Sequence, residues 1–102
     1  MLGHLTDREV ELIRRTIIAA AANLDLDYQT RIGIEKHDMQ DILASWPPVA
    51  DVETGSDAYV LITNSLNDVL NGMGLSDREV QQDIGCNRAE LSALFRKWQG
   101  ER

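Results

Sequence analysis

The sequence predicts an all-α protein, and three observations lead to that prediction. Apolar residues recur at three- and four-residue spacings, helix-capping residues precede these stripes, and glycine or proline follows them. The second half also echoes the first, which predicts about six helices in two tandem repeats, each long, short and medium. A chain of 102 residues leaves little room for a second domain, so we expect 1–102 to form one domain.

The first helix is predicted over 7–23. Thr6 and Glu9 have the spacing of a capping box, in which each side chain accepts from the other residue's backbone N–H. The first repeat, expected at about 6–46, starts with this helix. Its apolar stripe comprises Val10, Ile13, Ile17, Ala20, Ala21 and Leu24.

Two shorter helices complete the first repeat. One begins near Asp25 and ends at Gly33, because glycine readily takes the left-handed conformation of a helix C-terminus. The other carries Met39 and ends at Trp46, because the residue before a proline is pushed out of helical geometry. A linker with prolines, a glycine and acidic residues follows at 47–57.

The second repeat is expected at about 58–98. Its long helix carries an apolar stripe from Tyr59 to Met73, although the first five residues also suit a strand, which stays the local alternative. A second capping box at 76–79 opens a short helix that ends at a glycine, and Asn87 caps the last helix.

A shift of 52 residues aligns the two repeats. Any two helical hairpins share caps and glycines, but the matching glutamine and tryptophan favour a duplication. Neither repeat buries much surface alone, so we expect the two to pack around one core. The identical pairs are Asp25 with Asp77, Gln29 with Gln81, Ile32 with Ile84, Gly33 with Gly85 and Trp46 with Trp98.

Charge and residue usage disfavour several functions. The net charge of −7 argues against non-specific binding to phosphate backbones. No residues have the spacing of a catalytic or metal site, so we expect no enzyme activity, cofactor or metal. His37 with Asp38 and Asp41 comes nearest to a metal site, and a solvated helix face explains these residues more simply. Cys86 is expected to be a small buried hydrophobe rather than a nucleophile.

The sequence also bears on the compartment. The longest apolar run is far shorter than the roughly 20 residues of a membrane span, and the N-terminal residues lack the apolar core of a signal peptide. A single cysteine suits a reducing compartment. We therefore expect a cytoplasmic protein that does not enter a membrane.

Residues 74–98 follow the spacing of a DNA-binding motif. Its apolar and turn positions are Val80, Ile84, Gly85, Cys86, Leu91 and Leu94. The segment resembles the helix-turn-helix of bacterial regulators. That resemblance implies that the last helix enters the major groove, with these candidate contact residues: Asn87, Arg88, Ser92, Arg96, Lys97 and Trp98.

The first repeat fits the same apolar spacing around Gly33 but has an acidic outer face. Both repeats carry glutamine, at Gln29 and Gln81, where the family commonly has a small residue. At most one copy would read DNA, so two half-sites would need a dimer. Residues 30–33 and 65–72 also look like segments of small uncharacterised bacterial helical proteins, which implies a helical fold and no activity.

Two functions follow from these observations. The first is a non-catalytic regulatory or protein-interaction module that binds a protein partner or forms a homodimer. Its candidate partner surface is the amide-rich side of the fourth helix: Asn64, Asn67, Asp68 and Asn71. The second is a helix-turn-helix DNA-binding transcriptional regulator. This hypothesis becomes less well supported if acids within the fold pair with the basic residues of the last helix. For Trp98, capping of the core and a place on a binding surface both stay open.

Overall fold

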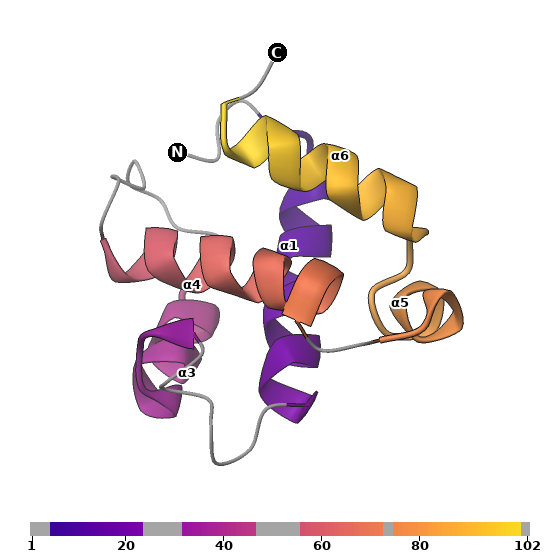
Figure 1. Ribbon diagram of the computed structural model, residues 1–102. Helices are drawn as coiled ribbons and strands as arrows, with labels where there is room; N and C mark the ends of the chain where they lie inside the picture. The colour runs from indigo at the N-terminus through magenta and orange to yellow at the C-terminus, as the bar shows by residue number, and fades with distance from the viewer. Residues whose placement is uncertain (1–4, 24–31, 47–55, 73–74, 101–102) are drawn as a thin grey trace.

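The computed structural model describes residues 5–23, 32–46, 56–72 and 75–100. All secondary structure in these ranges is helical (Figure 1), which confirms the all-α prediction. The strand alternative at the start of the fourth predicted helix is wrong. The elements are α1 (Asp7–Asn23), α3 (Lys36–Ala44), α4 (Asp57–Asn67), the π-helical turn η1 (Asp68–Gly72), α5 (Asp77–Asp83) and α6 (Arg88–Trp98).

The short helix predicted from Asp25 lies outside the described residues, except at its last position. Ile32 is helical there and fully buried, and Gly33 follows it. Most of the predicted linker, at 47–55, also lies outside them. None of the described helices is long and apolar enough to cross a membrane.

Local hydrogen bonds set the predicted helix starts. The Glu9 N–H donates to Thr6 Oγ1 at 3.1 Å and the Thr6 N–H donates to Glu9 Oε1 at 2.8 Å, which confirms the first capping box. Ser76 and Glu79 make the same reciprocal pair, with both distances 3.1 Å. Ser56 accepts from the Tyr59 N–H at 3.2 Å and starts α4. Each start thus satisfies amides that have no partner within the helix.

One hydrophobic cluster joins all the described helices. In Figure 1, α4 crosses α1, while α6 and α3 lie on opposite sides of α4. The apolar stripes predicted for the long helices meet in this crossing, and α5 and α6 add their own buried residues. The largest fully buried apolar side chains are Ile13, Ile17, Ile32, Leu61, Ile62, Leu66, Val69, Val80, Ile84 and Leu91.

Two glycine turns lie against the long helix of the other half of the chain. Gly33 has φ +92° and Gly85 has φ +94°, which is the left-handed region that favours glycine. A Cβ on Gly33 would lie 3.1 Å from Val60 Cγ1 of α4. A Cβ on Gly85 would lie 2.9 Å from Arg15 Nη1 of α1. The left-handed backbone therefore favours glycine at both turns, and at Gly33 a side chain would also have to displace Val60 slightly.

Candidate functional site

Arg88, the first residue of α6, binds inward rather than toward DNA. Its Nε donates to Asp77 Oδ1 at 2.9 Å, its Nη1 donates to the Leu70 carbonyl at 2.9 Å, and its Nη2 donates to the Leu75 carbonyl. The side chain is only 32% exposed. Carbonyls at the end of a helix lack partners within it and attract a cation. The predicted outward position of Arg88 is therefore wrong.

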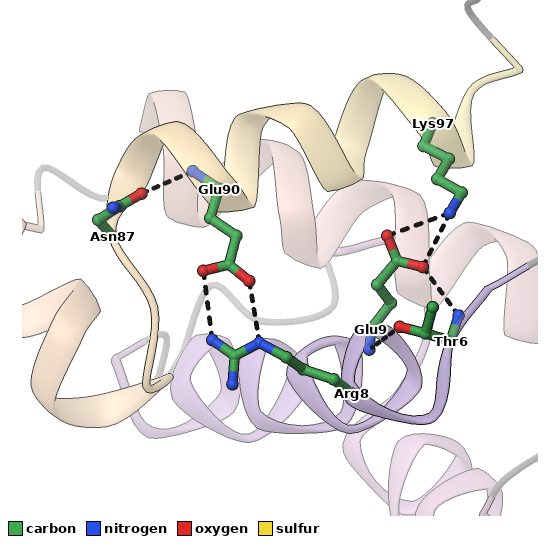
Figure 2. A network of polar contacts seen from close by, with 6 residues as sticks. All are labelled: Thr6, Arg8, Glu9, Asn87, Glu90 and Lys97. Carbon is green, nitrogen blue, oxygen red and sulfur yellow. Dashed lines mark hydrogen bonds and ion pairs between the residues drawn. The ribbon is translucent and has the colours of Figure 1, made fainter.

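Two ion pairs join α6 to the start of α1 (Figure 2). Lys97 Nζ donates to both carboxylate oxygens of Glu9, at 2.9 and 3.2 Å. Arg8 donates through Nε and Nη2 to the two oxygens of Glu90, at 3.0 and 3.2 Å. One basic side chain of α6 is thus matched by an acid of α1, and one acid of α6 is matched by a base of α1.

The other candidate contact residues of α6 have different surroundings. Asn87 is exposed, but its side chain accepts the Glu90 N–H at 2.7 Å and caps the helix. Ser92 is half-buried. Arg96 is exposed and makes no hydrogen bond or ion pair with another residue in the described part of the chain. Of the three predicted basic contacts, only Arg96 combines exposure with a lack of described partners.

Trp98 is a core residue at the end of α6. It is 8% exposed, and its Nε1 donates to Thr63 Oγ1 of α4 at 2.9 Å. Its ring lies 5.7 Å from the Tyr59 ring between centroids, at an interplanar angle of 34°. This burial supports core capping, and it removes Trp98 from the surface on which a partner was expected.

The amide-rich surface predicted on the fourth helix is divided in the structure. Asn64 donates to the Ile32 carbonyl at 2.7 Å and thereby supports the Gly33 turn. Asp68 is buried, at 7% exposure, where the helix widens into η1. Asn67 and Asn71 stay exposed and bond to each other at 3.1 Å. Of the four residues, only Asn67 and Asn71 are therefore exposed, because packing against the Gly33 turn and the core covers the other two.

His37 lies between two acids, and only one of them was expected. Its Nδ1 is 3.1 Å from Glu35 Oε2 and its Nε2 is 3.2 Å from Asp38 Oδ1. Glu35, rather than Asp41, therefore completes the cluster. Each ring nitrogen thus faces a carboxylate oxygen within hydrogen-bonding distance. The His37 side chain is 66% exposed, which agrees with a solvated helix face.

Cys86 is buried at 2% exposure beside the Gly85 turn. Burial raises the pKa of its thiol, the charge of Glu90 raises it further, and the charge of Arg8 opposes both. A thiol with a raised pKa stays protonated at neutral pH, and the thiolate is the nucleophilic form. This environment agrees with the prediction of a small buried hydrophobe.

A groove that the sequence did not reveal lies between α3 and the start of α4. Its volume is about 290 Å³, and its lining is mostly apolar. Ile42 of α3 is only half-buried here. No local sequence pattern predicts the groove, because its lining comes from two different helices, α3 and α4. Among the residues that the structure describes, its lining comprises Asp41, Ile42, Ser45 and Ala58.

Comparison with models of known protein families, with curated proteins and with solved structures finds no match to this chain. The function is therefore inferred from the chemistry of the described surfaces.

The acids near the start of α1 have depressed pKa values. Hydrogen bonds from Arg14 and Arg15, at 2.8 to 3.0 Å, lower the pKa of Glu11 from 4.5 to about 2. Partial burial acts to raise the pKa of Glu9, but the Thr6 backbone and Lys97 together lower it. Both carboxylates are thus stabilised in the charged form by the folded state.

Stability is expected to fall as the pH drops from about 4.5 toward 2, partly through these two groups. A folded pKa below the unfolded value of 4.5 adds stability that is present above pH 4.5 and lost as the folded pKa is approached. Glu11 is 41% exposed, so solvent screening limits its pairs to at most about 1 kcal/mol. We expect the free energy of unfolding of the double variant Glu9→Gln/Glu11→Gln to fall less steeply with decreasing pH than that of the wild-type protein. Urea unfolding followed by circular dichroism measures this dependence. A matched control, Asp83→Asn at an exposed position of α5, should keep the wild-type dependence of stability on pH. Equal slopes in all three proteins would contradict this prediction.

Proposed function

We propose that this protein is a non-catalytic module that acts by binding another protein. The observation that carries the proposal is the internal neutralisation of α6. Arg88 is held by Asp77, and Lys97 is held by Glu9. A helix that reads DNA needs cations free to meet phosphates, and here most of that charge is used within the fold. The buried, protonated thiol of Cys86 supports the non-catalytic part of the proposal.

A helix-turn-helix regulator is the second candidate. It is supported by the geometry around Gly85, whose left-handed turn joins α5 to α6, and by the exposure of Arg96. Glu90 on α6 and Glu9 beside it would repel a phosphate backbone if their own partners were withdrawn. The protein-binding proposal therefore fits the described charges better.

We also propose that the chain arose by tandem duplication, with repeats at about 6–46 and 58–98. Equivalent positions have equivalent environments, since Ile32 and Ile84 are both fully buried and Gly33 and Gly85 have nearly equal φ. Each glycine turn also contacts the long helix of the other repeat. These reciprocal contacts are what we expect of two repeats that bury their apolar faces against each other. The cytoplasm is the proposed compartment, because a buried free thiol suits a reducing environment.

Duplex DNA binding separates the two candidates. Fluorescence anisotropy of a labelled duplex at about 50 and about 200 mM salt is expected to show no binding by the wild-type protein. Affinity that is clear at low salt and falls steeply at high salt would replace the proposal with the regulator. Arg96→Ala is then the decisive variant, because Arg96 makes no hydrogen bond or ion pair with another described residue.

The proposal that this protein binds another protein is tested directly with the full chain. A partner captured from cell lysate must bind again as a purified protein, with a 1:1 or other fixed stoichiometry in calorimetry. Light scattering over a range of protein concentrations tests the homodimer. A chain that stays monomeric, captures no partner that rebinds and binds DNA would overturn the proposal.

A further inference from the structure

The groove between α3 and α4 has the size and surface of a small docking pocket. Its volume of about 290 Å³ corresponds to roughly ten water molecules at their liquid volume, which is room for one or two aliphatic side chains. Ile42 of α3 and Ala58 of α4 provide the apolar contact, and Asp41 stands on the rim. Figure 1 shows α3 lying beside the first turns of α4.

Negative charge without a described partner stands beside this groove. Asp41 and Asp57 are exposed, and neither makes a hydrogen bond or ion pair with another residue in the ranges that the structure describes. In contrast, Glu9, Glu11 and Glu90 each bind a basic side chain. Asp41 lines the groove itself, and Asp57 immediately precedes the lining residue Ala58 at the start of α4.

These observations together specify the partner. We propose that the groove docks a basic segment of a partner protein, in which an aliphatic side chain covers Ile42 and Ala58 while flanking Lys or Arg side chains meet Asp41 and Asp57. Apolar burial supplies affinity, and complementary charge speeds association and sets specificity. A second copy of this chain is disfavoured as the occupant, because each copy carries a net charge of −7. This inference rests on the proposed protein-binding function and names its site and the partner's chemistry.

A defined peptide tests the groove without knowledge of the natural partner. The probe is a fluorescein-labelled Lys-Lys-Leu-Leu-Lys-Lys peptide, titrated with the full chain at about 50 mM salt. Anisotropy should show binding that is lost when serine replaces both leucines or glutamate replaces the lysines. In ¹H–¹⁵N NMR spectra, the amide shifts of Asp41, Ile42, Ser45 and Ala58 should move most.

Two variants and a matched control give the decisive comparison. Asp41→Asn removes rim charge and should weaken peptide binding by about threefold to tenfold, a typical effect for one charge pair. Ala58→Leu fills the groove and should weaken it by about tenfold or more. Asp83→Asn makes the same charge change on α5 and should leave the affinity unchanged. The NMR map of the wild-type protein keeps the test valid if Ala58→Leu does not fold.

Several results would overturn the inference. Equal weakening by Asp41→Asn and Asp83→Asn, or equal binding of the serine peptide, would show attraction by overall charge alone. An absence of peptide-dependent shifts at the groove would exclude it as the site. Shifts there that grow with protein concentration in the absence of peptide would identify a second copy as the occupant. A natural partner whose affinity is unchanged by both variants would refute the groove while leaving the protein-binding function in place.

Discussion

Replacing Ile84 with alanine is expected to lower the free energy of unfolding by about 2–5 kcal/mol. Ile84 is fully buried at the end of α5, in the cluster that joins α1, α4 and α6. The variant loses the transfer free energy of the removed methyl and methylene groups, and it leaves a cavity that close-packed neighbours only partly fill. For a domain of this size, each kcal/mol lowers Tm by about 4–8 °C.

The matched control is Ile18→Ala, because Ile18 is 43% exposed on α1. Its loss is expected to be about 0.5 kcal/mol or less, as for other surface substitutions. Urea unfolding monitored by circular dichroism at constant pH measures both values. Similar losses at the two positions would mean that the phase of the helix around Ile84 differs from the one described.

Replacing Arg88 with alanine is expected to lower the free energy of unfolding by about 2–4 kcal/mol. Hydrogen bonds to a charged group contribute about 1.5–3 kcal/mol, and this guanidinium serves three acceptors. Its loss leaves the carbonyls of Leu70 and Leu75 without that donor and releases the end of η1 from the start of α6. The effect differs from that of an exposed ion pair because only 32% of the side chain meets solvent.

Arg96→Ala is the control for this variant, since it removes the same side chain from an exposed position of the same helix. Its stability should stay within about 0.5 kcal/mol of wild type. Arg88→Lys should fall between the two, because an ammonium group lacks the planar fork that reaches three acceptors. Thermal unfolding of the three variants under identical conditions gives the order of their stabilities. Equal stability of Arg88→Ala and Arg96→Ala would contradict the structural role assigned to Arg88.

The same comparison affects how binding data are interpreted. A loss of DNA or peptide binding in Arg88→Ala would carry no information about a contact, because the variant disturbs the α5–α6 turn itself. Arg96→Ala and Asp41→Asn change exposed side chains that bind no other described residue, so their effects report on a partner directly.

The surroundings of the candidate binding residues were the least predictable from the sequence. Arg88, Asn64 and Asp68 were all expected on outward surfaces from helical spacing. Spacing predicts which residues share a face of one helix, but a second element decides whether that face meets solvent. The Ile32 carbonyl accepts a hydrogen bond from Asn64 across 32 residues of sequence, and Glu90 accepts from Arg8 across 82. Such partners are set by packing and leave no local pattern.

The helical class, the capped helix starts and the two glycine turns could be predicted from local sequence alone. Each of these depends on groups within about four residues of one another, as in the reciprocal bonds of Thr6 with Glu9 and of Ser76 with Glu79. The pairing of Arg88 with Asp77 of α5 and of Lys97 with Glu9 of α1, and the apolar groove beside Asp41, became visible only in the folded structure. Those outcomes depend on how whole helices cross, because burial and ion pairing between distant segments exist only after the chain has packed.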